Sequence, residues 1–172
     1  IDVGGEETGI FLVRYGRLEA CDYFAFGAKS FSEAILDKLG VLEQDARILK
    51  ERYVARDLTE DVSHRIGEIF SFPLAHWFEK LKLKLKEMTP SSLLPSKVYI
   101  FGGGAFLPDF KRNLQTGKWQ NIVFSKKPDV ENLLPKDVLG DTLQGKEEIL
   151  NNPQYTPAVL ALKSQLELPN HG

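Results

Sequence analysis

Two glycine-containing segments combine residue types that can bind a phosphorylated ligand. The chain opens with "IDVGGEET", in which Asp2 and the pair Gly4-Gly5 follow the end of an apolar strand. Small residues at such a turn let backbone amides approach a phosphate closely, and a carboxylate at the strand end can orient Mg²⁺ or its waters. The first segment is therefore a candidate phosphate loop.

The second segment, "VYIFGGGAFLPDF", places Gly102, Gly103 and Gly104 between an apolar strand and a helix. A turn of this kind can lie flat against a base or a ribose, and the helix N-terminus that follows it favours anions. Neither segment matches the dinucleotide fingerprint, and neither carries a Walker lysine. For each segment taken alone, the alternative is that the glycines serve only a tight turn after a strand.

The first segment also carries Glu6 and Glu7, where a phosphate would be expected to sit. A carboxylate about 4 Å from a phosphate charge is repelled by roughly 1 kcal/mol at the dielectric constant of water, and by about 4 kcal/mol at an effective constant near 20. Hairpin side chains alternate in direction, so we expect one of the two glutamates to point away. The sequence therefore predicts that phosphate binding is weakened or lost.

These segments must be positioned by an alternation of strands and helices. We expect a β-hairpin from residues 10–13 and 19–26, and then a helix capped by Ser30 or Ser32 that ends at Gly40. A second helix covers 43–53. A long amphipathic segment over 60–88, capped by Thr59 or Asp61, contains Pro73, which predicts a kink or two helices.

The second half of the chain predicts fewer elements. A strand precedes the glycine triplet and a helix follows it, residues 121–124 ("NIVF") predict a short strand, and a last helix covers 156–166. Residues 125–153 lack periodicity and predict an irregular surface segment. Strands separated by helices indicate an α/β layered fold, and no segment reads as a second domain.

Composition excludes several classes of protein. The 172 residues are 42% hydrophobic and 27% charged, with a formal net charge of -2, which is typical of a globular chain and gives no reason to expect a nucleic-acid partner. The single cysteine, Cys21, cannot form an internal disulfide and is consistent with a reducing compartment. No apolar run approaches the roughly 20 residues of a transmembrane helix. The chain begins inside a strand, so we expect that an N-terminal part has been removed.

Four motifs in this order resemble the second half of an actin-like ATPase, most of all those of the FtsA and PilM group. They are the opening hairpin, "ARILK" at 46–50, "FGGGAFLP" at 101–108, and the segment around Tyr155-Thr156-Pro157-Ala158. The resemblance implies a ribonuclease H-like lobe with a mixed sheet, flanking helices and a small helical insert. It implies that 1–172 is one C-terminal lobe, that 27–57 is the insert, and that the N-terminal lobe is absent.

The resemblance also implies a set of ATP and Mg²⁺ contacts. Asp2 would be the Mg²⁺-associated carboxylate, and Lys50 would lie near the ribose or base. The phosphate side would comprise Gly4, Gly5 and the hydroxyl of Thr8, and the adenine side Gly102, Gly103 and Gly104. This sequence departs from the family pattern because Glu6 replaces a glycine, Glu7 replaces a threonine and Arg47 replaces a glutamate.

Members of this group are cytoplasmic ATP-binding proteins that assemble with protein partners at the inner face of the membrane, in cell division or type IV pilus biogenesis. The resemblance therefore implies protein partners, and it allows a homo-oligomer. A degenerate, non-hydrolysing scaffold and a phosphotransferase related to sugar or acetate kinases are the alternatives. No catalytic residue is assigned, and a single lobe is not expected to turn over ATP.

Overall fold

The computed structural model describes residues 1–89, 93–139 and 147–167, and it confirms the mixed α/β architecture. Strands β1 (Asp2–Val3), β2 (Thr8–Arg14) and β3 (Arg17–Phe24) form an antiparallel sheet in the order β1-β2-β3. Strands β4 (Lys97–Ile100) and β5 (Asp129–Asn132) pair in parallel. A parallel bridge between Asp2 and Phe101 joins the two sheets, so β1 lies between β2 and the end of β4.

The predicted hairpin is confirmed; its first strand is longer than expected, and its second begins and ends two residues earlier than expected. Tyr15 and Gly16 form its two-residue turn, both with positive φ, and Arg14 pairs with Arg17. Two consecutive residues with positive φ match the right-handed twist of the flanking strands. The turn sets the register of Arg14 and Val13, and a shift of one residue between Leu12 and Val13 then brings Thr8 opposite Phe24 at the other end of the hairpin.

Three helices follow the hairpin: α1 (Lys29–Leu39), α2 (Glu43–Val54) and α3 (Glu60–Met88). α3 is one helix that contains Pro73, so of the two predicted outcomes, a kink or two helices, the second does not occur. Thr59 is its N-cap residue, although its side chain makes no capping hydrogen bond. The last turns end at Gly40 for α1 and at Thr89 for α3. No helix among the described residues is long and apolar enough to cross a membrane.

After β4 come the 3-10 turn η1 (Gly103–Phe106) and α4 (Pro108–Thr116). The predicted strand at 121–124 is wrong, because Phe124 makes only an isolated bridge with Leu94. The expectation of an irregular segment over 125–153 is also wrong where the structure describes it. That segment contributes β5 and the short helices α5 (Pro135–Leu139) and α6 (Glu147–Leu150), and it ends at η3 (Pro153–Tyr155), which leads into α7 (Thr156–Glu167).

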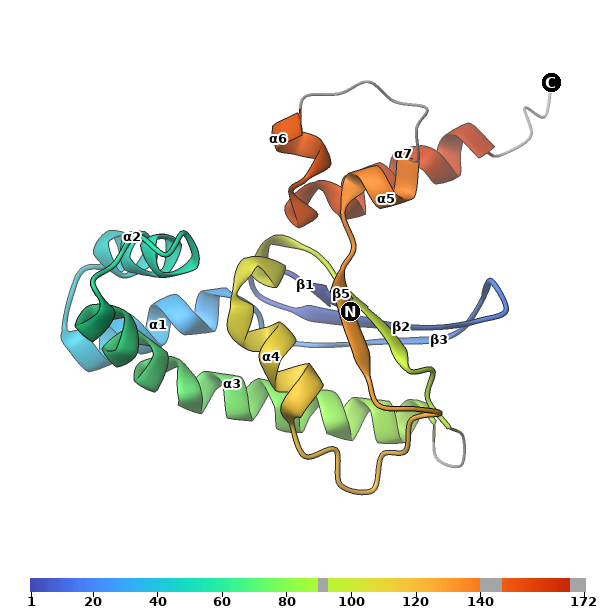
Figure 1. The fold of residues 1–172 in the computed structure, drawn as a ribbon, viewed down its shortest axis with the longest axis horizontal. Coiled ribbons are helices and arrows are strands. Elements are labelled where there is room, and N and C mark those ends of the chain that lie inside the picture. Colours follow the sequence, from blue (N-terminus) through green and yellow to red (C-terminus); the bar gives the residue numbers. More distant parts are fainter. Residues whose placement is uncertain (90–92, 140–146, 168–172) are drawn as a thin grey trace.

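The core lies between the sheet and α3, which runs along one side of it, while α5, α6 and α7 lie on the other side (Figure 1). Its centre is aromatic: the ring of Phe110 contacts those of Phe31 and Trp77, with centroids 5.1 and 4.5 Å apart. Each such fully buried side chain stabilises the fold by about 1.5–3 kcal/mol. These contacts join α1, α3 and α4, and so hold the helical pair α1–α2 next to the helix that follows the glycine triplet.

Candidate functional site

The two glycine bends lie side by side at the same end of β1. Phe101 is hydrogen-bonded to both sides of Asp2: Val3 N donates to the Phe101 carbonyl at 2.8 Å, and Phe101 N donates to the Ile1 carbonyl at 3.0 Å. β1 therefore leads into the first bend at the point where β4 leads into the second. The sequence predicted that both bends bind one ligand. One ligand can contact both bends only if they are adjacent, and in the structure they are.

Gly102 and Gly104 are required by this close approach. A Cβ on Gly102 would overlap Asp2 Oδ1 and would lie 2.7 Å from the Val3 carbonyl oxygen, and the residue has a φ of +89°. A Cβ on Gly104 would overlap the Val3 side chain. Gly103 differs from both, because within the described structure no atom beyond its own neighbours along the chain lies within 4 Å of where its Cβ would be. Of the triplet, Gly103 is thus the residue with open space in front of it.

The first bend is a tight turn over Gly4–Glu7, closed by a hydrogen bond from Gly4 N to the Glu7 carbonyl at 2.9 Å. Its carbonyls point toward α1: Ala28 N donates to Gly4 O at 2.9 Å, and Lys29 N donates to Gly5 O at 2.8 Å. These bonds satisfy the first amides of α1, which sequence reasoning had assigned to a cap by Ser30 or Ser32. That assignment was wrong, since the N-cap residue is Ala28 and no side chain caps the helix.

Close packing of the α1 start against the turn depends on Gly27, which the sequence had not singled out. A Cβ there would lie 2.5 Å from Gly5 O and 2.7 Å from Gly4 O. The carbonyls of Gly4, Gly5 and Glu7 all accept hydrogen bonds. Within the described ranges, no hydrogen bond takes the N–H of Gly5 or Glu6. Unpaired amides in a glycine turn are the donors that a phosphate binds.

The two glutamates of the turn have different charged neighbours. The Lys29 ammonium lies 3.1 Å from Glu6 Oε1, and both side chains are exposed. Burial raises the pKa of the Asp2 carboxyl above its usual range, and the nearby Glu7 carboxylate adds to this rise. Glu7 is therefore the glutamate whose charge reaches Asp2, while Glu6 has a cationic partner.

Thr8 does not face the turn. Its side chain is fully buried, its hydroxyl donates to the Phe26 carbonyl at 2.7 Å, and it accepts from Trp77 Nε1 at 3.0 Å. Both hydrogen-bonding roles of the hydroxyl are used inside the core. The structure thus contradicts the expectation that Thr8 supplies a phosphate-binding hydroxyl.

Lys50 on α2 is half-buried next to the first bend. Its ammonium donates to the Ala28 carbonyl at 3.2 Å, and burial lowers its pKa, with Glu51 opposing and Arg47 reinforcing that shift. The amide of Ala28 donates to the Gly4 carbonyl, so the Lys50 ammonium binds the residue that is itself bonded to the first bend. Arg47 is exposed and lies 3.6 Å from Glu51.

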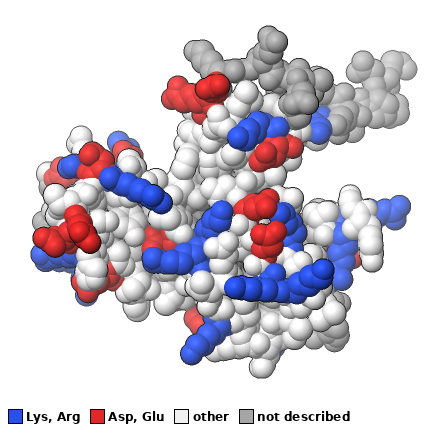
Figure 2. All heavy atoms as spheres, viewed as in Figure 1, with Lys and Arg blue, Asp and Glu red and all other residues white. Residues whose placement is uncertain are grey.

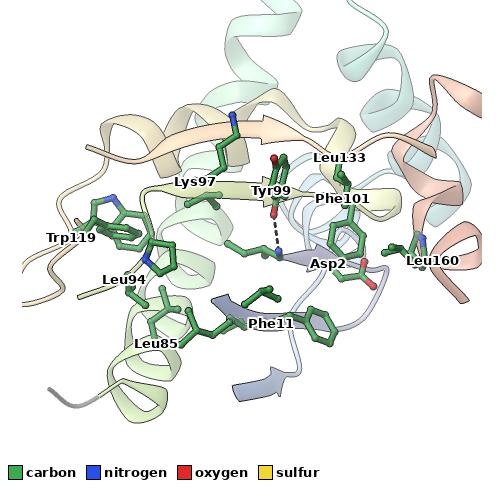
Figure 3. A pocket seen from close by; sticks show the side chains of 18 residues that line it. Asp2, Phe11, Leu85, Leu94, Lys97, Tyr99, Phe101, Trp119, Leu133 and Leu160 are labelled. Atoms are coloured by element: carbon green, nitrogen blue, oxygen red, sulfur yellow. Dashed lines mark hydrogen bonds between the residues drawn. The ribbon is translucent and has the colours of Figure 1, made fainter. Parts of the chain in front are cut away.

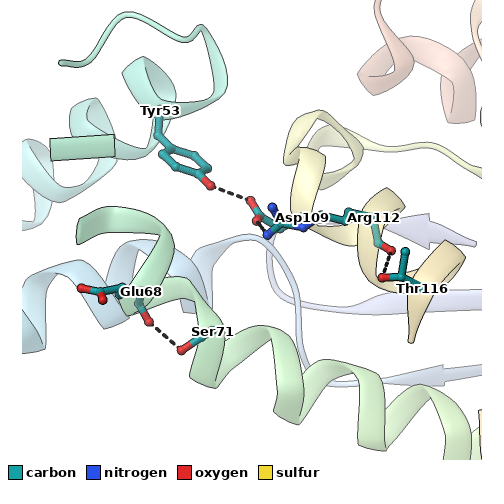
Figure 4. Close-up of polar contacts among 6 residues, drawn as sticks. All are labelled: Tyr53, Glu68, Ser71, Asp109, Arg112 and Thr116. Carbon is teal, nitrogen blue, oxygen red and sulfur yellow. Dashed lines mark hydrogen bonds and ion pairs between the residues drawn. The ribbon is translucent and has the colours of Figure 1, made fainter. Parts of the chain in front are cut away.

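A second polar contact at this site was missed by the sequence analysis (Figure 4). The Tyr53 hydroxyl of α2 donates to Asp109 Oδ2 of α4 at 3.1 Å, and Asp109 also pairs with Arg112 at 2.6 Å. Burial, followed by the Asp109 charge, raises the pKa of Tyr53 to about 12. Asp109 is 2% exposed, and an isolated Asp in a helix first turn gives no sequence signal of such a partner. The contact ties the helical pair to the helix after the glycine triplet.

The acidic groups of the site do not form a metal cage. Within the described residues, no group of three or more His, Cys, Asp or Glu could hold a metal ion. Asp2 offers a carboxylate at the end of β1, beside the turn that carries Glu6 and Glu7. A single carboxylate of this kind fits a Mg²⁺ ion that keeps its waters and binds phosphate oxygens. Figure 2 shows Lys, Arg, Asp and Glu interspersed on the viewed face, with the surface hollowed between the helical pair and the upper part of the molecule.

Comparison with known proteins identifies the fold. No family model and no curated protein matches the sequence. A chain of the PilM–PilN type IV pilus biogenesis complex has a TM-score of 0.71 at 22% identity, over 94% of this chain and 44% of that one. Ethanolamine utilization protein EutJ from Carboxydothermus hydrogenoformans has a TM-score of 0.50 at 23% identity, over 74% and 43%. The chain therefore has an actin-like ATPase fold, as predicted, and spans less than half of each of these proteins.

Proposed function

We propose that this actin-like chain is one lobe of an ATP-binding protein, in which the nucleotide controls assembly with protein partners in type IV pilus biogenesis. The observation that carries the proposal is the contact of Gly102 with Asp2 and Val3, which brings both glycine bends to one end of β1. A phosphate turn and a base-facing turn must adjoin if one nucleotide is to touch both. The second support is the fold shared with a chain of the PilM–PilN complex.

Each residue has a stated role in this proposal. The N–H groups of Gly5 and Glu6 would hold phosphate oxygens, and Asp2 would orient Mg²⁺ through its waters. Gly103 would face the base, since nothing fills the space in front of it. Lys50 would add a positive charge on the ribose side. Thr8 takes no part, because its hydroxyl is used in the core.

We expect weak binding, because Glu7 places a second carboxylate near Asp2. Mg²⁺ would offset this charge in part. The same observation favours a second candidate, a degenerate actin-like scaffold that retains the fold for protein contacts and no longer binds nucleotide. No described residue suggests the substrate site that a phosphotransferase would need, so that alternative has no support of its own.

The proposal includes the organisation of the whole protein. We propose residues 1–172 as one lobe, with 27–57 as its helical insert and with the other half of the nucleotide site in a second lobe. Protein partners and a place at the cytoplasmic face of the membrane belong to the same proposal. A role in cell division stays a prediction.

Calorimetry of the full-length protein with Mg-ATP tests the proposal. We expect binding with a dissociation constant between micromolar and millimolar. Gly103→Val should weaken it at least about tenfold, which corresponds to about 1.4 kcal/mol, without lowering the melting temperature. Gly16→Asn is the matched control, since Gly16 lies at the distal hairpin turn with a φ of +74°, which Asn tolerates.

Two results would overturn the nucleotide site. The first is no heat of binding at millimolar Mg-ATP with either the natural protein or the Glu6→Gly, Glu7→Thr double variant. The second is binding that Gly103→Val leaves unchanged. Binding by the double variant alone would establish the scaffold instead, with charge repulsion as the cause.

A further inference from the structure

Residues 110–128, which include most of α4 and the loop that leads from it to β5, are strongly basic. They contain five basic side chains and no acidic one, whereas the whole chain has 24 Asp and Glu against 22 Lys and Arg. One of the five, Arg112, pairs with Asp109 at 2.6 Å. Within the described residues, no ion pair or hydrogen bond involves the other four basic groups, which are the ammonium groups of Lys111, Lys118, Lys126 and Lys127.

These four lysines form one surface, which we call the basic face. Lys118, Lys126 and Lys127 are exposed, and Lys111 on α4 is half-buried. On the viewed face of Figure 2, blue side chains lie over α4 and over the loop below it. The acidic residues that follow along the chain, in β5, both pair with Lys97 and so leave the charge of the basic face unpaired; they are Asp129 and Glu131.

Hydrogen bonds and ring contacts fix the shape of the loop that carries three of these lysines. The Leu94 backbone exchanges hydrogen bonds with the residues on both sides of Phe124, each at 2.8 Å. The ring of Trp119 contacts those of Phe78 and Phe124, with centroids 4.8 Å from each. Figure 3 shows Trp119 on the inner side of the loop, where it lines an apolar pocket together with Leu94. The loop is therefore a fixed platform beneath the lysines.

One apolar side chain points out of the basic face. Around the bridge between Phe124 and Leu94, successive side chains alternate in direction, so those of Ile122 and Phe124 pack against the core and that of Val123 points outward. Val123 is 58% exposed. It lies five positions after Lys118 and three before Lys126, so an apolar contact stands among the positive charges.

The basic face and the glycine bends lie at opposite ends of β4 and β5. The glycine triplet follows the carboxyl end of β4, and α4 runs back from there. The loop after α4 then enters the amino end of β5, which is parallel to β4. The basic face therefore stays accessible when a nucleotide occupies the bends.

We propose that the basic face lies on the anionic surface of a phospholipid bilayer, with Val123 at the depth of the headgroups. This assignment rests on the membrane location in the proposed function and identifies the surface that makes the contact. Lysine is a flexible point charge without the fork geometry of arginine, which suits headgroups that have no fixed arrangement. Each lysine near such a surface strengthens binding by about fivefold, which corresponds to about 1 kcal/mol.

Two other anionic partners fit this surface less well. Proteins that bind single-stranded nucleic acid stack bases on aromatic rings, and protein interfaces are anchored by Trp, Tyr and Arg. On the basic face, Trp119 is packed against two rings and its Nε1 donates to the Leu114 carbonyl at 3.2 Å, while Arg112 is paired with Asp109. The anchors that either partner would need are thus already engaged within the lobe.

Co-sedimentation of the full-length protein with lipid vesicles tests the proposal. One set of vesicles contains equal parts of phosphatidylglycerol and phosphatidylcholine, and the other contains phosphatidylcholine alone. The test variant combines Lys118→Gln, Lys126→Gln and Lys127→Gln. The matched control removes the same charge from α1 and α3, from side chains that have no ion pair within the described structure, by combining Lys38→Gln, Arg65→Gln and Lys80→Gln.

We expect the natural protein to bind the anionic vesicles and not those of phosphatidylcholine alone. Binding should weaken as NaCl is raised from about 0.1 to 1 M, because the Debye length falls from about 10 to 3 Å. The test variant should bind at least about fiftyfold more weakly, and the control less than about fivefold more weakly. Val123→Trp should bind more tightly, and its added emission should shift to shorter wavelength only with anionic vesicles. All variants should keep the melting temperature of the natural protein.

Equal losses for the test variant and the control would overturn the basic face and leave the membrane location standing. No binding to either kind of vesicle would overturn both. Binding to poly-glutamate or to a single-stranded oligonucleotide as tight as that to anionic vesicles, and lost in the test variant, would overturn the bilayer as the partner. An unshifted emission from Val123→Trp would overturn the placement of Val123. Mg-ATP calorimetry should give the same dissociation constant for the test variant and the natural protein, so a failure of the nucleotide site is read separately.

Discussion

Gly102→Ala is the sharpest test of how the two bends are held together. Gly102 has φ +89° and ψ 172°, a conformation that is essentially restricted to glycine and that costs about 1–3 kcal/mol for other residues. The added Cβ would overlap Asp2 Oδ1 and would lie 2.7 Å from the Val3 carbonyl oxygen, so β1 must shift. Overpacking of this kind costs about 1–3 kcal/mol. We therefore expect a loss of about 2–6 kcal/mol in the free energy of unfolding.

The measurement is urea denaturation followed by circular dichroism, with thermal melting as a second readout. At about 2–4 °C per kcal/mol for a chain of this length, the melting temperature should fall by about 10 °C. Gly103→Ala is the matched control, because its Cβ meets no atom within 4 Å, and it should change stability by no more than about 0.5 kcal/mol. A loss below about 1 kcal/mol for Gly102→Ala, or equal losses for the two variants, would refute the close approach.

Three other perturbations test separate parts of the structure. Thr8→Val should lower the free energy of unfolding by about 2–4 kcal/mol in urea denaturation, because Trp77 and Phe26 lose a buried hydrogen-bond partner. Thr8→Ser keeps the hydroxyl and should lower it by about 1 kcal/mol. Equal losses for the two variants would contradict the hydrogen bonds. The folded-state pKa of Tyr53 is raised from 10.0 to about 12, so its contribution to stability is complete below pH 10 and is lost between pH 10 and 12. Tyr53→Phe should remove this part of the fall in the free energy of unfolding with pH. An unchanged dependence on pH would refute the contact. Glu7→Gln should lower the Mg-ATP dissociation constant about threefold or more in calorimetry, and Glu6→Gln should lower it less because Lys29 already pairs with Glu6; the reverse order would contradict this assignment.

Elements with strong periodicity or turn signals could be predicted from the sequence. The hairpin around Gly16, the helix that ends at Gly40 and the long apolar stripe of α3 all form where expected. β5 was missed because "DVEN" contains a single apolar residue, Val130, which alone is buried in the strand. Its pairing with β4 is a tertiary contact, and the weak β-propensity of its own residues carries no trace of it.

Site residues were predictable where backbone geometry demands a residue type, and were missed where a partner lies far away in sequence. The glycines at both bends predicted that another group approaches the backbone closely, but the sequence could not identify that group. The resemblance assigned the Thr8 hydroxyl to the ligand, yet this hydroxyl accepts a hydrogen bond from Trp77, 69 positions away. Asp109 and Tyr53, 56 positions apart, could not be paired from the sequence for the same reason.

The glycines fall into two groups, those that the packing of the fold requires and those that it does not. Gly27, Gly102 and Gly104 have backbone or side-chain atoms where a Cβ would stand, so the fold alone accounts for them. Gly5 and Gly103 have nothing within 4 Å, and neither has a positive φ that would exclude other residues. No contact in the described structure requires glycine at either position, and glycine costs unfolded-state entropy that alanine would not. The ligand hypothesis gives these two glycines a role that the fold alone does not, and Gly5→Ala should weaken Mg-ATP binding in calorimetry while leaving the melting temperature unchanged or higher. A variant that binds as tightly as the natural protein would remove the phosphate turn from the site.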